Sequence, residues 1–600
     1  MRRRRSIGAE VVDGGVSFRV WAPAHEKVAV VIDDRDYPLD REPNGYFSGL
    51  VKSAKAGTRY KFRLERDAFP DPASRFQPEG PHGPSYVVDP TAFRWTAKPP
   101  DVRRRVIYEM HIGTFTREGT FVAAIEHLAE LAEIGINVLE VMPINEFAGR
   151  FGWGYDGVDL WAPFHVYGEP DDFRRFVDAA HARGLAVILD VVYNHLGPDG
   201  NYLTQFTPSY FTSKYPNDWG ESVNFDDVDA HGVREFFAEN AAYWIDEFHL
   251  DGLRLDATQS IIDLSGAHVT RQITDRARAA AGHREIFIVA ENEPQDARLI
   301  TEYGVDAMWN DDWHHSSFVA LTGRIEAYYT DYRGRPQEFV SMARHGFLFQ
   351  GQRYTWQKNP RGTPSHDIAP EHFVCFIENH DQVANTADGS RLPASGRKRA
   401  MTALVLLQPQ TPMLFQGQEF GSTAPFLYFA DHDPELARLV REGRREFMKQ
   451  FPSIDVSKLA APELEATFAM CKLDHNARDE EIVELHRSLL ALRNESPFCD
   501  ARRVEGAVLG EHCFLLRWLA PDDRLLIVNL GDALHFEPAS EPLLAPPRGA
   551  DGWRLLWTSD GSQRFDEWRI PAEAAIVLRP RDDSRDSRSN TRTSAVYSIA

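Results

Sequence analysis

The sequence predicts an α/β protein whose centre is a (β/α)8 TIM barrel, with an N-terminal β-sandwich and a C-terminal antiparallel β-domain. Eight short apolar runs, most of them separated by stretches with helical periodicity, are typical of buried parallel strands covered by helices. Segments on either side of this region alternate apolar and polar residues, as strands with one exposed face do. The 600 residues exceed what one hydrophobic core usually organises, which favours several domains.

The first predicted domain covers residues 1–98 and is an immunoglobulin-like β-sandwich. Apolar and polar residues alternate at Val16–Trp21 and Val28–Ile32, and Asn44-Gly45 provides a hairpin turn signal. A Pro-rich and Gly-rich stretch at 69–84 follows the last clear strand pattern. Because this stretch also contains an arginine and two phenylalanines, we predict an ordered irregular loop and not a flexible linker.

The predicted barrel covers residues 99–498. Segments such as Phe121–Ile134 and Asp172–Arg183 have the 3.6-residue apolar period of surface helices, and Gly135 and Gly184 stand where these helices should end. The eight predicted strands are Val106–His111, Ile136–Pro143, Ala186–Asp190, Leu250–Asp256, Ile286–Glu291, Ala307–Asn310, Phe373–Glu378 and Pro412–Phe415.

A long segment, residues 196–229, follows the third strand and is rich in Gly, Pro, Tyr and Asn. Such an excursion at the catalytic end of a barrel is expected to form a lid or a wall of the cleft. Strand patterns return from about Arg503, so residues 499–580 are predicted to form the C-terminal β-domain. The polar stretch 581–600 is predicted to be disordered.

The composition restricts the class of partner and the compartment. The chain has 67 Lys and Arg against 89 Asp and Glu, a net charge of −22, which argues against nucleic acid or a membrane surface as partner and favours a neutral substrate. No apolar run reaches the ~20 residues that cross a bilayer, and the basic start lacks the apolar part of a secretory signal. Four cysteines without a metal or disulfide spacing fit a reducing cytosol. We therefore expect a soluble cytoplasmic protein.

Three carboxylates, Asp256, Glu291 and Asp381, come at or just after the ends of the fourth, fifth and seventh predicted strands. Barrel enzymes carry their catalytic groups on the loops after these strands, so the three should meet at one mouth and suggest glycosidic-bond chemistry. Arg254 lies two residues before Asp256 and shares its face of the strand, where its charge favours the ionised form needed by a nucleophile. Alternatively, Asp256 caps the helix that follows.

The other two carboxylates are expected to have different roles. Glu291 is expected to stay protonated because neighbouring carboxylates disfavour its ionisation, and so to act first as general acid and then as base; Glu293 is a rival. Asp381, beside His380, could bind sugar hydroxyls and stabilise positive charge at the anomeric carbon. A structural His–Asp pair is the alternative.

Residues at the end of the third strand complete the predicted site. Asp190 is expected to orient Arg254, His195 to donate to a substrate hydroxyl, and Asn194 to fix the loop. One histidine with scattered carboxylates does not match a transition-metal spacing, so we predict no catalytic metal and no cofactor. A structural calcium ion remains an open possibility.

Four segments together resemble the signature regions of the α-amylase-type glycoside hydrolase family: Asp190–His195, Gly252–Asp256, Val289–Glu291 and Asn379–Asp381. Met142-Pro143 and Gln416–Glu419 are similar to its accessory regions. The resemblance implies a carbohydrate-module-like N-terminal sandwich and a retaining mechanism through a covalent glycosyl-enzyme. It also implies that Asp256 is the nucleophile, Glu291 the acid/base and Asp381 the stabiliser, with the two principal carboxyls ~5 Å apart.

The same resemblance implies further substrate contacts. Gly152–Asp156 is similar to the family's stacking platform, with Tyr155 under the −1 sugar and Trp153 in support. The complete predicted substrate-binding set is Arg254, His195, His380, Tyr155, Asn379, Gln259 and Trp219. Ala257-Thr258-Gln259 departs from the Lys-His that many members have after the nucleophile, and Trp219 could instead pack its loop against the barrel.

Two stretches, Asp71–Ser85 and Phe426–His432, resemble a trehalose-releasing branch of the family. This implies hydrolysis of the α-1,4 bond next to the terminal trehalose unit of maltooligosyl trehalose. It also implies functional coupling to the synthase that isomerises the reducing end of a maltooligosaccharide to make this substrate. Glycogen branching enzymes, which share the sandwich, the barrel and the Gly-Gln-Glu motif, are the alternative. A non-catalytic glycan-binding protein is a third hypothesis, which the intact carboxylates oppose.

Overall fold

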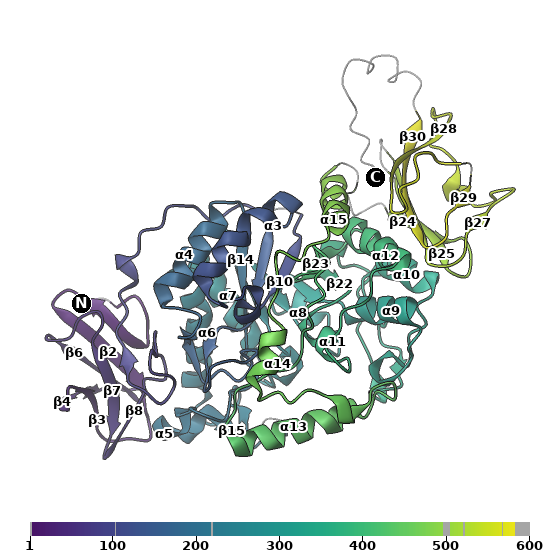
Figure 1. Cartoon of the computed structure of the whole chain (residues 1–600). Coiled ribbons are helices and arrows are strands. Elements are labelled where there is room, and N and C mark those ends of the chain that lie inside the picture. The colour runs from purple at the N-terminus through teal and green to yellow at the C-terminus, as the bar shows by residue number, and fades with distance from the viewer. Residues whose placement is uncertain are drawn as a thin grey trace.

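The computed structural model describes residues 3–102, 104–217, 220–495, 498, 504–519, 523–566 and 568–581. An N-terminal pair of β-sheets, a central barrel and a C-terminal β-domain follow one another along an elongated molecule (Figure 1). The predicted tail, except for Arg581, and Trp219 of the predicted substrate-binding set lie outside the described residues.

Eight parallel strands close into a barrel in the order β10-β11-β14-β17-β18-β19-β22-β23. Each of the eight predicted runs overlaps one of these strands, in the predicted order, and β14 and β23 extend one residue beyond their runs. The barrel prediction is confirmed. Every strand residue is buried, which is why the runs look continuously apolar instead of alternating. The strands are β10 Ile107–Met110, β11 Val138–Val141, β14 Ala186–Val191, β17 Gly252–Leu255, β18 Phe287–Ala290, β19 Ala307–Trp309, β22 Phe373–Phe376 and β23 Thr411–Phe415.

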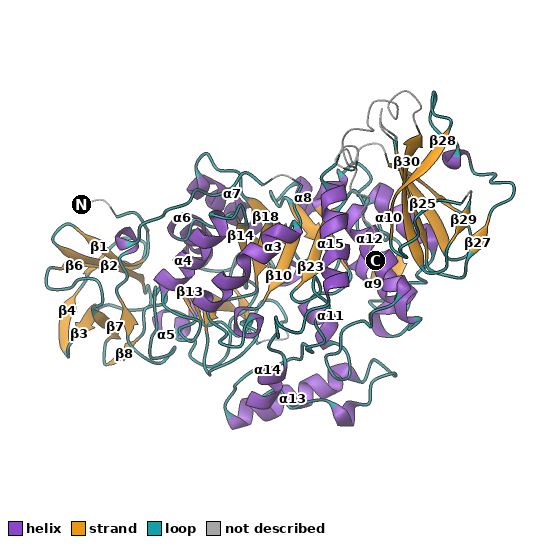
Figure 2. Cartoon of the chain, turned by 45° about the horizontal axis from the view of Figure 1, so that its top comes forward, coloured by secondary structure: helices purple, strands orange, loops and turns teal. Residues whose placement is uncertain are grey.

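Helices surround the barrel (Figure 2). The helix predicted at Phe121–Ile134 is divided by a 3-10 turn at Ile125–His127. Its second half ends at Gly135, whose φ of 110° is accessible to glycine at little cost. The helices are α1 Ile112–Phe115, α2 Phe121–Ala124, α3 Leu128–Ile134, α4 Pro170–His181, α5 Leu203–Phe206, α6 Ala230–Glu247, α7 Val269–Ala281, α8 Arg298–Thr301, α9 Asp311–Thr322, α10 Pro336–His345, α11 His380–Ala384, α12 Gly396–Leu407, α13 Pro434–Met448, α14 Glu465–Met470 and α15 Glu480–Arg493.

The N-terminal domain consists of two antiparallel sheets, in the orders β1-β2-β6-β5 and β4-β3-β7-β8, with β9 added to β7. Alternate residues such as Phe18 and Phe62 are fully buried between the sheets, as the alternating pattern predicts. The strands are β1 Gly8–Val12, β2 Gly15–Trp21, β3 Val28–Ile32, β4 Arg35–Pro38, β5 Asp40–Arg41, β6 Tyr46–Val51, β7 Arg59–Leu64, β8 Asp67–Phe69 and β9 Ser85–Tyr86.

The N-terminal domain packs against helix α6 of the barrel. Trp21 is fully buried against this helix, where a Cβ added to Gly232 would lie 2.2 Å from the indole ring. The proline-rich stretch is ordered by side-chain contacts, because buried Arg75 lies 3.5 Å from the carboxylate of Glu247 at the end of α6. The sandwich is therefore docked firmly on the barrel.

The segment predicted as a lid, residues 196–229, contacts the N-terminal domain. Phe206 of α5 packs edge-on against Phe62 of β7, and the ring of Tyr210 lies 5.3 Å from that of Trp21. The segment contains the short strands β15 Phe211–Thr212 and β16 Ser222–Val223. It therefore bridges the barrel and the sandwich.

The C-terminal domain is a five-stranded antiparallel sheet, in the order β24-β25-β26-β30-β28, with a two-stranded sheet of β27 and β29. Its β24, β25 and the barrel helix α10 pack together. The strands are β24 Val504–Val508, β25 Cys513–Trp518, β26 Arg524–Asn529, β27 Leu534–His535, β28 Gly552–Thr558, β29 Arg569–Ile570 and β30 Ala574–Arg581. Small two-stranded sheets elsewhere are β12 Asn145–Glu146 with β13 Asp159–Pro163, and β20 Arg353–Tyr354 with β21 Asn359–Pro360.

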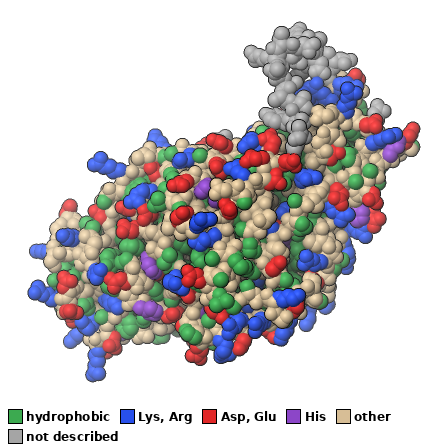
Figure 3. Space-filling view, viewed as in Figure 1, with side chains coloured by type: hydrophobic (Ala, Val, Ile, Leu, Met, Phe, Trp, Pro, Cys, Tyr) green, Lys and Arg blue, Asp and Glu red, His purple; other side chains and the backbone are tan. Residues whose placement is uncertain are grey.

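Charged side chains of both signs are interspersed over the face seen in Figure 3, despite the net charge of −22. Within the described residues, none of the helices combines the length and the apolar character that crossing a bilayer requires. The described cysteines Cys375, Cys471 and Cys513 are buried and free.

Candidate active site

The barrel register brings the predicted catalytic residues together. Asp190 on β14 pairs with Arg254 on β17, and Leu255 pairs with Ala290 on β18. Asp256 and Glu291 each follow one of these last two positions, so they leave adjacent strands at the same level of the barrel mouth. Parallel strands end at the same edge, which is why residues 35 positions apart can meet.

Arg254 is the centre of the site. Its fully buried guanidinium donates from Nη1 to both oxygens of Asp190, at 2.9 and 2.8 Å, and to Oδ1 of Asp256 at 2.6 Å. From Nη2 it donates to Oε2 of Glu291 at 2.8 Å. The ring of Trp309 lies under it, with its centroid 4.2 Å from Cζ. A planar guanidinium has a fixed fork of donors, so this one residue holds three carboxylates in a defined arrangement.

Asp256 is held through both carboxylate oxygens. Asn194 donates from Nδ2 to Oδ2 at 2.7 Å and to the backbone carbonyl of Asp256 at 2.9 Å, while Arg254 occupies Oδ1. The side chain keeps 11% of its surface exposed, so part of the carboxylate remains accessible. Asn194 was predicted to fix the loop; it orients the predicted nucleophile itself.

Glu291 is anchored on one side only. Its Oε2 accepts from Arg254 and, at 3.0 Å, from the backbone amide of Ala257, and its side chain is 21% exposed. Burial raises the pKa of Glu291; the guanidinium of Arg254 opposes this shift and the charge of Asp256 adds to it. The pKa of Glu291 is therefore raised, as predicted, but the main cause is burial and not the neighbouring carboxylates.

His380 joins Asp381 to the centre of the barrel. Its Nδ1 lies 2.5 Å from Oε1 of Glu109, and its Nε2 lies 3.0 Å from the hydroxyl of Tyr155 and 3.4 Å from Oδ2 of Asp381. Burial lowers the pKa of His380, but the charges of Asp381 and Glu109 outweigh it and raise the pKa to about 9. The ring is therefore protonated at neutral pH. The side chain of Asp381 is 42% exposed.

Several predicted substrate ligands have protein partners in the structure. Tyr155 stacks on His380, with centroids 5.3 Å apart, and donates to Asp190 at 2.7 Å. Asn379 is buried, and its Oδ1 accepts from the amide of Gln382 at 2.8 Å, which caps α11. Both nitrogens of His380 also have protein partners. The substrate contacts of Asn379 and His380 stay predictions.

The remaining predicted ligands differ in exposure. His195 is buried and hydrogen-bonded to Asn194 through Nδ1, and burial lowers its pKa to about 4, so the ring is neutral. Gln259 is exposed and accepts from the amide of Glu293 at 3.4 Å. As stated above, Trp219 is outside the described residues, and its assignment stays a prediction.

Glu293, the rival acid, belongs to another ion-pair network. It lies 2.9 Å from Nη1 of buried Arg361, which also contacts Asp312 at 3.1 Å and Asp311 at 3.7 Å. Burial raises the pKa of Asp311 to about 8, although Arg361 opposes the shift. Glu293 is therefore paired with Arg361, whereas Glu291 is paired with Arg254.

Glu109 and Trp309 belong to the site but were not among the predicted residues. Both are fully buried barrel residues, Glu109 holding His380 and Trp309 lying under Arg254. A charged residue inside the apolar run Ile107–Met110 was the available signal, because a buried carboxylate requires a partner. Glu140 in β11 gave the same signal; it is buried, and burial raises its pKa strongly.

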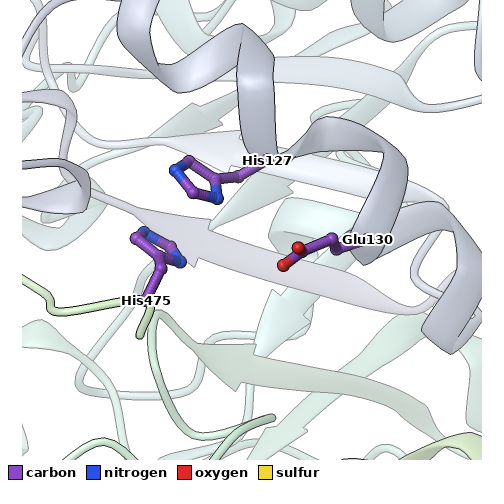
Figure 4. Close-up of side chains that lie close together, drawn as sticks. All are labelled: His127, Glu130 and His475. Carbon is purple, nitrogen blue, oxygen red and sulfur yellow. The ribbon is translucent and has the colours of Figure 1, made fainter. Parts of the chain in front are cut away.

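A group that could hold a metal lies away from these residues. Nitrogen or oxygen atoms of His127, Glu130 and His475 come within 4.8 Å of one another (Figure 4). The two imidazole rings are stacked 3.6 Å apart, and Nη1 of Arg478 lies 3.1 Å from the carboxylate of Glu130. The stacked rings and the guanidinium already give these groups partners.

Comparison with known proteins places this geometry in a family. The family model for the α-amylase catalytic domain matches residues 90–221, that for carbohydrate-binding module 48 (the isoamylase N-terminal domain) matches residues 6–92, and a domain of unknown function, DUF3459, matches residues 501–577. Malto-oligosyltrehalose trehalohydrolase of Deinococcus radiodurans is 38% identical over 91% of this chain and 93% of its own. That of Saccharolobus solfataricus is 40% identical over 82% and 87%. The chain belongs to the malto-oligosyltrehalose trehalohydrolase family.

A branching enzyme is a more distant relative of this trehalohydrolase family member, and solved structures support its fold. The branching enzyme GlgB of Corynebacterium jeikeium is 29% identical over 70% of this chain and 62% of its own. A 1.4 Å crystal structure of an alpha-amylase candidate from Salmonella typhimurium has a TM-score of 0.87 at 37% identity, covering 96% of this chain and all of that one. A pullulanase of Anoxybacillus has a TM-score of 0.71 at 18% identity, covering 97% and 88%, which supports the fold alone.

Proposed function

We propose that this chain hydrolyses the α-1,4-glucosidic bond next to the terminal trehalose unit of maltooligosyl trehalose, releasing trehalose and a maltooligosaccharide. The family membership supports this reaction and makes the branching enzyme the weaker alternative. The observation that carries the catalytic assignment is the buried Arg254, because it binds Asp256 and Glu291 through neighbouring nitrogens of one guanidinium. Two carboxyls held this closely suit a double displacement, which needs a separation of about 5–5.5 Å.

In the first step, Asp256 attacks the anomeric carbon while Glu291 gives its proton to the departing glycosidic oxygen. The C–O bond breaks, trehalose leaves, and an ester joins Asp256 to the maltooligosaccharide. In the second step, Glu291, now anionic, takes a proton from a water molecule that attacks the same carbon. The ester bond breaks, and both carboxyl groups regain their starting protonation states with retention at the anomeric centre.

The other site residues are proposed to support these steps. Asp381, which His380 holds, faces positive charge developing at the anomeric carbon and binds sugar hydroxyls. Asn379, His380 and Tyr155 shape the −1 subsite. His195 is assigned to a sugar hydroxyl, while Gln259 and Trp219 are assigned to the trehalose side.

The test is product analysis with two substrates. Maltooligosyl trehalose should give free trehalose, and a plain maltooligosaccharide should change little. Amylose should gain no α-1,6 linkages, whereas their formation would favour the branching alternative. Absence of trehalose from the first substrate would contradict the proposal.

We also propose a cytoplasmic location and functional coupling to a maltooligosyltrehalose synthase. The described cysteines are free and buried, which suits a reducing compartment, and the substrate must be produced by isomerising the end of a maltooligosaccharide. We further propose that the N-terminal domain ends near residue 98 and the barrel domain near residue 498. Cell fractionation and an assay coupling both enzymes would test the first two points, and limited proteolysis the third.

A further inference from the structure

A cavity of about 240 Å³ lies outside the proposed active site, between α12, α15, the α11–α12 loop and the turn after β23. Helices α12 and α15 pack against each other beside the barrel (Figure 1). Gly417 and Gln418 of the Gln416–Glu419 motif line the cavity, and the proposed reaction gives this motif no role. None of the proposed catalytic carboxylates contributes to its lining.

Four buried nitrogen atoms of the lining residues have no hydrogen-bond partner within the described part of the chain. They are Nη1 of Arg391, Nε of Arg399, Nε2 of Gln418 and Nε2 of His486. Gln418 is 5% exposed and His486 is 2% exposed. Leaving such groups unpaired in a protein interior is costly, so several of them around one cavity indicate a missing partner.

The carboxylates of the cavity are already committed to other groups. Glu378 accepts from the amide of Leu392 at 2.6 Å and lies 3.2 Å from Nζ of Lys398. Asp479 caps α15 by accepting from the amide of Glu481 at 2.9 Å. Arg391 and Arg399 are therefore left without a carboxylate within ion-pair distance among the described residues. Two guanidinium groups in this state favour an anionic ligand.

His486 adds an acceptor to these donors. Its Nδ1 lies 2.8 Å from the carbonyl of Ile482, so that nitrogen carries the proton. Burial lowers the pKa of His486 to about 4, so the ring is neutral and its Nε2 presents a lone pair. A matching ligand therefore carries a hydroxyl as well as anionic oxygens.

We propose that this cavity binds a small oxyanion of the phosphate class. Its oxygens accept from Arg391, Arg399 and Gln418, and its hydroxyl donates to His486. The first turn of α12, capped by Ser395, adds the positive end of a helix dipole. Leu392, Ile482 and Leu485 also line the cavity and would contact the carbon skeleton of a phosphate monoester. Free phosphate and a sugar phosphate share this chemistry.

The test is isothermal titration of the full chain with inorganic phosphate and, separately, glucose 6-phosphate, at constant ionic strength set with sodium chloride. Saturable binding of either probe is expected, with a thermal midpoint that rises with the logarithm of its concentration. Arg399→Gln should weaken binding at least tenfold, because it removes a charged donor. The matched control is Arg397→Gln on the same helix; Nε of Arg397 lies 2.9 Å from Glu573, outside the cavity, and affinity should not change.

Tighter binding of inorganic phosphate would identify the free ion as ligand, and tighter binding of the sugar phosphate would identify a monoester. No saturable binding of either probe, or equal affinity for the wild type and Arg399→Gln, would overturn the proposal and leave water as the partner of these groups. If Arg399→Gln fails to fold, Gln418→Leu takes its place with the same expected loss. Because the readout is binding, this test can fail without affecting the proposed hydrolysis.

Discussion

Arg254 is the residue on which the proposed chemistry depends. It is fully buried and donates to Asp190, Asp256 and Glu291. The sequence predicted its pairing with Asp256, because residues two apart in a strand share a face. The predicted contact with Asp190 is also present, but the bond to Glu291 depends on the register of β17 and β18, which the sequence does not display.

Replacing Glu291 by Gln should lower kcat at least about 100-fold while the substrate still binds, because the amide cannot transfer a proton. Steady-state kinetics and equilibrium binding of maltooligosyl trehalose would measure both. Glu293→Gln is the matched control; Glu293 is held by Arg361 and should keep most of the activity. A Glu291→Gln protein with normal kcat would remove the acid/base assignment.

The free energy of unfolding should depend on pH through the ion pair between Glu109 and His380. The pKa of folded His380 is about 9, above the ordinary 6.5, so its protonated form stabilises the fold below pH 6.5 and this contribution is lost as the pH rises through about 9. Glu109→Gln removes one of the two carboxylates that raise this pKa, so the loss should begin about one pH unit lower. Urea unfolding of both proteins between roughly pH 6 and pH 10 would test this, and identical profiles would contradict it.

At the scale of elements, the apolar period predicted correctly where strands and helices occur, but it did not predict where a helix is interrupted. The barrel strands occur where eight apolar runs predicted them, because strands buried on both faces need apolar residues at every position. The helix predicted at Phe121–Ile134 is interrupted at Ile125–His127, although its apolar period continues. A 3-10 turn changes the hydrogen-bond pattern without removing the apolar face, so the pattern alone does not reveal it.

Two helical glycines should respond in opposite directions to alanine. A Cβ at Gly232 of α6 would lie 2.2 Å from the ring of Trp21, so Gly232→Ala should destabilise the protein by about 1–3 kcal/mol. Gly443 of α13 has no atom within 4 Å of such a Cβ, so Gly443→Ala should stabilise it by about 1 kcal/mol through helix propensity. Denaturant unfolding measures both, and equal effects would argue against a tight contact at Trp21.

At the scale of the whole molecule, buried charges join the N-terminal domain to the barrel. Glu247, at the end of α6, lies 3.4 Å from Arg5 and 3.5 Å from Arg75, and all three side chains are almost completely buried. The predicted lid segment also contacts this domain, through Phe206 and Tyr210. The first domain and the long segment are therefore parts of one assembly with the barrel.

Glu247→Gln should cost about 3–5 kcal/mol, because it leaves the buried guanidinium of Arg75 without its counter-charge, whereas Arg5 keeps its ion pair with Asp246. Denaturant unfolding would measure the cost, and limited proteolysis would show whether the N-terminal domain becomes accessible. Glu239→Gln on the same helix is the control; its partner Arg276 is 33% exposed, so the loss should be about 1 kcal/mol or less. Equal losses from both substitutions would contradict a special role for the buried site.

The sequence by itself determined the barrel, the flanking β-domains and the three carboxylates, because each is encoded locally. Strand burial leaves an apolar run and a half-exposed strand leaves an alternation. Of the proposed catalytic carboxylates, Asp256 and Glu291 directly follow their strands, and Asp381 comes in the loop after its strand. Only the tertiary structure decided that Glu109 holds His380, that Asn194 holds Asp256, and that burial is the main cause of the raised pKa of Glu291. These features depend on distances between segments far apart in the chain and on how much water reaches each group, and neither quantity leaves a periodic trace in the sequence.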